Sequence, residues 1–192
     1  MLDLLQSDLI TLLFILITMF WWLEFVFFKK EKETKEKKDK SFIFILIAIV
    51  FTIIFSLLLY NFEILNITSN LRSTLRVLSI IIYGLGLFIR YWSLITLGNH
   101  FSRQIDVEKE QTLVSHGPYR LLRHPSYTGL FLLNLGVQLF ISNILGLIAG
   151  IIIILIVLIY RMKIEEKQMT DVIGNKYVKW KESRDRLIPF IY

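Results

Sequence analysis

The sequence predicts an all-α, polytopic membrane protein of about five transmembrane helices with a C-terminal helical tail. Hydrophobic residues make up 55% of the 192 residues, and they occur in blocks long enough to cross a bilayer. The charged residues fall mainly between these blocks and in the tail, which is typical of cytoplasmic loops. At this length we expect one domain, residues 1–192.

The first span is predicted at 9–28, where tryptophans and flanking lysines suit a membrane interface. Asp3 and Asp8 precede it without a basic n-region, and no small-residue cleavage site follows. We therefore expect a retained span and not a signal peptide. Residues 29–40 carry seven lysines and four acids, which favours a solvated loop beside anionic lipids over a binding site. The second span is predicted at 42–60.

The third span is predicted at 73–97, after a short polar connector over 61–70. Its Gly-Leu-Gly at 84–86 would let a neighbouring helix approach closely. A nucleotide-binding turn is not expected there, because no strand precedes it and a third glycine is missing. The Arg-Tyr-Trp at 90–92 most simply forms an interface anchor, and a role in a site is the alternative.

A hairpin of two further spans is predicted at 126–141 and 144–160, turning at 142–143. The first of the two is short, so it must tilt, thin the bilayer or lie partly inside the bundle. Asn134 and Gln138 stand four residues apart on it, and we expect interhelical hydrogen bonds from both in preference to the alternative role of substrate ligands.

Five spans place three charged segments on one side: residues 29–40, 98–125 and the tail from 161. The positive-inside rule makes that side cytoplasmic, so the N-terminus is expected outside and the C-terminus inside. Arg72 and Arg76, near the outer end of the third span, are the exception.

Polar chemistry concentrates in 98–192, which is the expected catalytic region. Gly117-Pro118 is a turn pair, and Pro125 biases His124 away from helical backbone while suiting a first helical position. The next helix should therefore begin there, and its first amides make a ready anion site.

Short motifs run in order through roughly the C-terminal half of the chain. They are Asn99-His100-Phe101, Gln104, Thr112 to Val114, Gly117 with Tyr119, Arg123 to Tyr127, Arg161 with Glu165-Glu166, Gly174 with Tyr177, and Pro189 to Ile191. In this order and spacing the chain resembles the isoprenylcysteine carboxyl methyltransferase family, integral membrane enzymes that use S-adenosylmethionine. The related phospholipid methyltransferases share the Arg-His-Pro and Glu-Glu elements, so the acceptor is less closely defined than the cofactor.

The resemblance implies a cytoplasmic loop and adjoining helix ends that bind S-adenosylmethionine. The implied cofactor-binding residues are Gln104, Gln111, Thr112, Leu113, Val114, Tyr119, His124, Pro125, Ser126, Tyr127 and Glu165. Their chemistry agrees: backbone groups can bind adenine edges, tyrosines can pack on a sulfonium, and a carboxylate can accept ribose hydroxyls or an ammonium. The cofactor carboxylate would suit the helix start at Pro125.

The resemblance makes Arg161 the catalytic, acceptor-side residue, because its planar fork would orient a carboxylate. Arg161 and Glu165 share a helix face, and without the preceding motifs a surface ion pair would be the simpler interpretation. Glu166 should point elsewhere and act behind the site or at the surface. His116 receives no role.

Other classes of site are not expected. The sequence has no cysteine, and neither His100 nor His116 fits a metal-ligand pattern, so a metal site is not predicted. The charge of +6 occurs without a basic groove interleaved with aromatics, so nucleic acid is not an expected partner. No feature indicates an oligomeric state.

The expected reaction is methylation of a lipophilic carboxylate, best represented by the α-carboxylate of a prenylated cysteine. A carboxylate acceptor needs no general base, since opposite charges cancel as the bond forms, and no dedicated base is evident. The alternatives are methylation of a phospholipid amine or another lipid oxygen, a membrane reductase, and a non-catalytic binding or transport protein. Short length and absent cysteine favour a prokaryotic membrane.

Overall fold

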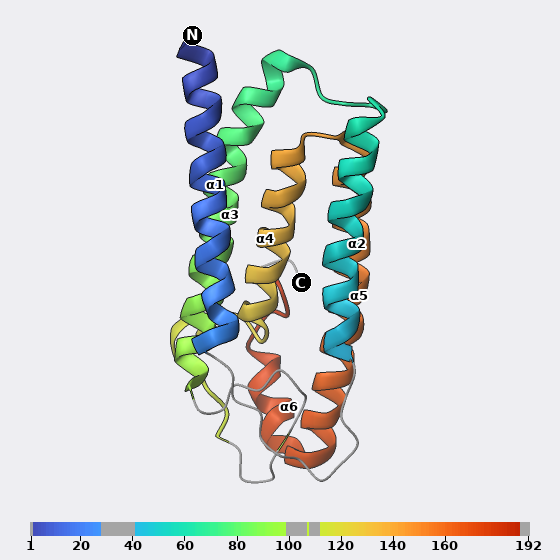
Figure 1. The fold of residues 1–192 in the computed structure, drawn as a ribbon. Helices are drawn as coiled ribbons and strands as arrows, with labels where there is room; N and C mark the ends of the chain where they lie inside the picture. Colours follow the sequence, from blue (N-terminus) through green and yellow to red (C-terminus); the bar gives the residue numbers. More distant parts are fainter. Residues whose placement is uncertain (1, 28–40, 99–106, 108–111, 189–192) are drawn as a thin grey trace.

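The structure is a computed structural model that describes residues 2–27, 41–98, 107 and 112–188, and within these residues all regular structure is helical. The helices are α1 (Leu2–Phe27), α2 (Ser41–Asn61), α3 (Ser69–Leu97), α4 (Pro125–Ile141), α5 (Ile144–Ile173) and α6 (Asn175–Glu182), with a short 3-10 helix η2 (Gly117–Arg120) before α4. The all-α prediction is confirmed. Successive long helices run in opposite directions, and α4 lies between the α1–α3 pair and the α2–α5 pair (Figure 1).

Within the described residues, three helices are long and apolar enough to cross a bilayer: α2, α5, and α3 from Leu71 onward. The apolar helix α4 is shorter than these three helices, in agreement with the short span predicted at 126–141. Along α1, Leu12, Leu16 and Met19 are exposed, as expected of a helix that faces lipid. These five helices match the five predicted blocks in position.

The last predicted span and the start of the tail form one continuous helix, which is a correction to the predicted end at 160. α5 continues to Ile173 because no proline or glycine interrupts residues 151–173. The break falls at Gly174, whose φ of 69° favours glycine. The helical tail then ends at Glu182.

Glycines let α3 and α4 pack backbone against backbone. A Cβ added at Gly86 would lie 2.8 Å from the backbone nitrogen of Leu133, and one added at Gly136 would lie 3.0 Å from the Cα of Tyr83. A Cβ at Gly84 would meet nothing within 4 Å. The predicted close approach at 84–86 is therefore made by Gly86 alone.

Polar side chains inside the bundle join α4 to its neighbours, as predicted for Asn134 and Gln138. Asn134 accepts a hydrogen bond from Thr52 of α2 at 3.2 Å and donates to the Gly150 carbonyl of α5 at 3.1 Å. Gln138 accepts a bond from Ser56 at 2.5 Å. These bonds satisfy polar groups that lipid could not.

We call the two ends of the bundle the turn end and the tail end. The turn end holds the connector 62–68 and the α4–α5 turn at 142–143 (Figure 1). The tail end holds η2, the first turn of α4, the last turns of α5, α6 and the C-terminal segment, residues 183–188 (Figure 1). The described residues of the expected catalytic region that lie just before α4 and after Tyr160 are therefore at the tail end.

Candidate active site

At the tail end, Tyr127 links Arg161 and Glu165, the two residues that the sequence places four apart on α5. The Tyr127 hydroxyl donates to Oε2 of Glu165 at 2.8 Å and accepts from Nε of Arg161 at 3.1 Å. Nη1 of Arg161 also donates to the hydroxyl of Ser41, at the start of α2. Arg161 and Glu165 are thus oriented by a hydroxyl from α4, and not only by their shared helix face.

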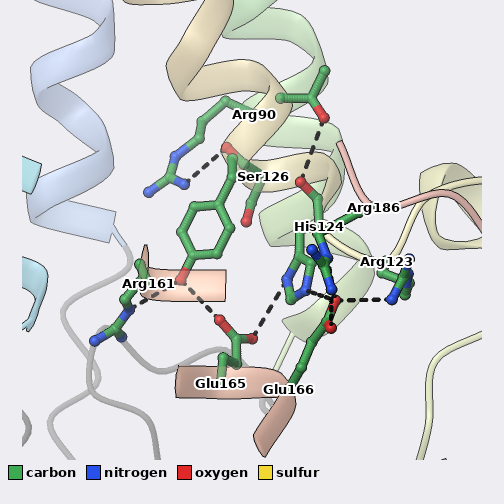
Figure 2. A network of polar contacts seen from close by, with 10 residues as sticks. Arg90, Arg123, His124, Ser126, Arg161, Glu165, Glu166 and Arg186 are labelled. Atoms are coloured by element: carbon green, nitrogen blue, oxygen red, sulfur yellow. Dashed lines mark hydrogen bonds and ion pairs between the residues drawn. The ribbon is translucent and has the colours of Figure 1, made fainter. Parts of the chain in front are cut away.

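Glu166 is a buried hub for cationic groups (Figure 2). Its carboxylate accepts from Arg123 at 3.0 Å and from Arg186 at 2.9 and 2.8 Å. Nε2 of His124 lies 3.2 Å from the same carboxylate, while Nδ1 of His124 lies 3.9 Å from Oε1 of Glu165. The surface alternative is wrong, because Glu166 is buried and three basic groups from two chain segments enclose its carboxylate. A place behind the site stays a prediction.

The C-terminal segment runs beside the pre-α4 loop, which we define as residues 112–124. The two segments exchange backbone hydrogen bonds, and a threonine of α4 binds the segment further along. The bonds are Arg123 N to Asp185 O at 2.8 Å, Asp185 N to Leu121 O at 3.0 Å, His124 N to Arg186 O at 3.2 Å, and Thr128 Oγ1 to Leu187 O at 2.6 Å. The end of the described chain therefore holds the loop that leads into α4.

Trp180 and Arg184 fasten the earlier part of the pre-α4 loop. Nε1 of Trp180 lies 3.2 Å from the Val114 carbonyl and 2.9 Å from the Ser115 hydroxyl, and can donate to both. Arg184 packs over the Trp180 ring at 4.6 Å and donates from Nε to the Tyr119 carbonyl at 2.8 Å. The predicted adenine-binding segment is thus positioned by α6 and the residues after it.

Tyr119, in the η2 turn of the pre-α4 loop, is buried. Burial raises the pKa of its phenol well above the usual value, and the negative charge of Glu165 adds to the rise. The phenol therefore stays neutral across the physiological range. A neutral phenol ring can pack against a cationic ligand, and the binding of that ligand then does not depend on the protonation state of the phenol.

Arg90 is not an interface anchor, which corrects the simpler prediction for 90–92. Its guanidinium is buried and pairs with Glu24 of α1. It also donates to the Ser126 carbonyl at 3.1 Å (Figure 2). Trp92, in contrast, is exposed as an anchor would be. Arg90 faces inward because its backbone, within α3, lies directly against Gly129 of α4.

The structure brings part of the predicted site set together. Six predicted residues surround the start of α4 and the facing turn of α5: Tyr119, His124, Pro125, Ser126, Tyr127 and Glu165, with Arg161 beside them. Three others, Thr112, Leu113 and Val114, lie at the beginning of the pre-α4 loop, further from α4, and Thr112 is exposed. Gln104 and Gln111 lie outside the described residues. The predicted helix start at Pro125 is confirmed.

Several residues of this network were not singled out from the sequence: Glu24, Trp180, Arg184 and Arg186. They come from α1 or from the tail, far from the motifs along the chain. A carboxylate inside a hydrophobic block, such as Glu24, was the one available signal. Within the described residues, no cluster of three or more potential ligands could hold a metal ion, and the metal-free site stays a prediction.

The sequence around this site is similar to that of known proteins. Residues 77–171 match the family described as isoprenylcysteine carboxyl methyltransferase (ICMT). The chain belongs to this family. Its matched region contains Arg90, the pre-α4 loop, all of α4 and the Arg161–Glu166 turns.

Named relatives come from plants, fungi and animals. The chain is 32% identical over 108 residues to protein-S-isoprenylcysteine O-methyltransferase A of Arabidopsis thaliana, covering 55% of each chain. It is 33% identical over 117 residues to the Saccharomyces cerevisiae protein-S-isoprenylcysteine O-methyltransferase, covering 60% of this chain and 49% of the relative. The chain thus spans about half the length of the curated relatives it matches.

A solved structure shares the fold. It is the eukaryotic intramembrane Ras methyltransferase of the same family, with a TM-score of 0.63 and 25% sequence identity. The match covers 74% of this chain and 52% of that chain. Together with the apolar helices, this similarity makes the chain a polytopic integral membrane protein.

Proposed function

We propose that this protein transfers a methyl group from S-adenosylmethionine to the carboxylate of a lipophilic acceptor, best represented by a prenylated cysteine. The observation that carries the proposal is the Arg161–Tyr127–Glu165 arrangement at the tail end. It places a cation and a carboxylate on either side of one hydroxyl, within the region that matches the family. We also propose that 98–192 carries the chemistry within a single domain.

The described residues fit the cofactor. Glu165 and Glu166 are neighbours, yet the Glu165 side chain is 25% exposed whereas that of Glu166 is 8% exposed and held by arginines. Glu165 is therefore the carboxylate that can receive the ammonium or the ribose hydroxyls of S-adenosylmethionine. Residues 112–114 and the first turn of α4 would complete the set.

Arg161 suits the acceptor side. Its bonds to the hydroxyls of Tyr127 and Ser41 orient the guanidinium. A carboxylate acceptor would bring the matching anion, which a planar fork binds at two points. Arg161 is itself buried, and charged contacts are stronger in such a place than in water.

When bound, S-adenosylmethionine supplies a methyl group on a cationic sulfonium. The chain's residues would hold the two reactants in line and keep water away. Tyr127 bonds to both Arg161 and Glu165 and holds their side chains in place, and the buried Tyr119 stays neutral. A carboxylate nucleophile is already deprotonated, so no residue has to act as a general base.

The proposed location follows from the charge distribution. We propose a prokaryotic cell membrane with the N-terminus outside and the tail end in the cytoplasm, where the cofactor is present. Reporters fused before Met1 and after Tyr192 should then report opposite sides of the membrane. Both reporters on one side would contradict an odd number of spans.

The decisive experiment is methyl transfer from labelled S-adenosylmethionine by the detergent-solubilised chain. Farnesylated N-acetylcysteine serves as the carboxylate acceptor, and phosphatidylethanolamine as the competing amine. We expect labelled methyl ester on the first and none on the second. Labelling of the amine alone would overturn the carboxylate proposal. Calorimetric titration with S-adenosylhomocysteine and with NADPH separates a methyltransferase from a reductase.

A further inference from the structure

A buried ion pair connects α1 to α3 beside the first turn of α4. Nη2 and Nε of Arg90 donate to the two carboxylate oxygens of Glu24 at 2.6 and 3.0 Å. Trp21 lies three residues before Glu24 and donates to the same carboxylate from Nε1 at 3.2 Å. The exposed fractions of the Arg90 and Glu24 side chains are 5% and 2%. The two-point geometry leaves the guanidinium little freedom to rotate.

The remaining arm of Arg90 reaches the candidate active site (Figure 2). Nη1 donates to the Ser126 carbonyl at 3.1 Å, in the turn that carries Tyr127. The backbones are also close, since a Cβ at Gly129 would lie 2.9 Å from the Cα of Arg90. The position of this α4 turn is therefore set by Arg90 through both its backbone and its side chain.

Stability alone is a poor reason for such a pair. Removing two charges from water costs about as much as their attraction returns, and apolar residues of similar volume often serve as well. Charged residues inside a membrane bundle more often mark function. The hydrogen bond from Nη1 indicates a role in the site, because its acceptor is the carbonyl of Ser126, the residue before Tyr127.

We propose that Glu24 and Arg90 are positioning residues for methyl transfer. Glu24 fixes the guanidinium so that Nη1 holds the Ser126 carbonyl, and this keeps the Tyr127 hydroxyl between Arg161 and Glu165. The catalytic consequence rests on the proposed function. Glu24 lies in α1, outside the matched residues 77–171, so the family match does not supply this role.

The test separates positioning from stability. Glu24→Leu leaves a buried cation without its carboxylate and should lower the melting temperature. The double variant Glu24→Leu/Arg90→Met removes both charges at similar volume and should recover the melting temperature. Its kcat should nevertheless stay about ten- to a hundredfold below wild type, because the Ser126 carbonyl has lost its donor. A double variant with wild-type melting temperature and wild-type kcat would overturn the proposal.

A matched control removes another link between α1 and α3. Tyr91 donates from its hydroxyl to the Phe20 carbonyl at 2.9 Å, and Tyr91→Phe deletes that bond without touching Ser126. This variant should keep wild-type kcat. If the double variant fails to fold, Arg90→Lys takes its place, since lysine keeps the charge but cannot bind Glu24 at two points and also reach Ser126. Wild-type kcat in Arg90→Lys would likewise refute the positioning role.

Hydrogen exchange provides a readout that does not depend on activity. In the double variant, amides of 126–131 should exchange faster than in wild type, whereas those of 145–150 at the turn end should not change. If the wild-type chain methylates no acceptor, the proposed function fails and the exchange comparison alone decides this inference. Unchanged exchange at 126–131 would then reject it.

Discussion

The two ends of the bundle are fastened by different chemistry. At the turn end, Asn143 donates to the Ile64 carbonyl at 2.6 Å and to Asn66 at 2.9 Å, and accepts from the Gly146 amide at 2.8 Å. At the tail end, the corresponding hub is the Glu166 carboxylate with its arginines. A neutral amide and a charged carboxylate thus perform similar tethering at opposite ends of α5.

The difference between the two ends indicates where a buried charge is needed. One asparagine caps α5 and holds the connector, so neutral groups are sufficient to join helix ends. Buried charges cost more to desolvate, and their use is justified where charge itself is required. The tail end combines a hub that organises the loop with a neighbouring carboxylate, Glu165, that remains partly exposed. We infer that Glu166 holds the surrounding loop in place, whereas Glu165 binds the cofactor.

The largest expected effect comes from neutralising the hub. Glu166→Gln leaves Arg123 and Arg186 near a neutral amide in a buried place, and should destabilise the protein by about 3–5 kcal/mol. Asn143→Ala at the turn end removes a helix cap and should cost about 0.5–2 kcal/mol. Thermal unfolding in detergent measures both, and methyl transfer at a permissive temperature should fall only in the first. Equal losses of activity would remove the distinction between the ends.

The next effect separates the two sides of the tail-end site. Arg161→Lys keeps the charge but loses the fork, so kcat/KM for the acceptor should fall on the order of ten- to a hundredfold, the equivalent of roughly 1.5–3 kcal/mol. KM for S-adenosylmethionine should change little. Glu165→Gln should instead raise that KM. The measurement is initial rates with each substrate varied, and near-wild-type turnover in Arg161→Lys would show that the two-point contact is not needed.

The smallest effect sharpens the comparison with two matched glycines. A Cβ at Gly129 would meet the Arg90 backbone at 2.9 Å, and one at Gly146 would meet the Cα of Ser56 at 3.0 Å. Each alanine variant should therefore cost about 1–3 kcal/mol through overpacking. Only Gly129→Ala should also lower kcat, because it displaces the α4 turn that carries Tyr127. A similar fall in kcat for Gly146→Ala would mean that general loosening, and not site geometry, limits turnover.

The sequence by itself determined the elements whose causes are local. Hydrophobic blocks predicted the positions of the five long helices, since length and hydropathy are properties of a contiguous segment. The start of α4 at Pro125 and the turn at 142–143 were confirmed for the same reason. The four-residue spacing of Asn134 and Gln138 also correctly predicted bonds to neighbouring helices. The motifs indicated the family, which the comparisons confirmed.

Only the tertiary structure decided which polar groups meet. Glu24 and Arg90 are separated by 66 residues, and no local pattern connects a carboxylate in one helix to an arginine in another. Arg186 reaches Glu166 because α6 reverses the chain after Gly174, and Tyr127 enters between Arg161 and Glu165 because α4 packs against α5. A residue's helix can be predicted from its neighbours in sequence, but its partner depends on how separate helices pack, and packing sums contacts over the whole chain.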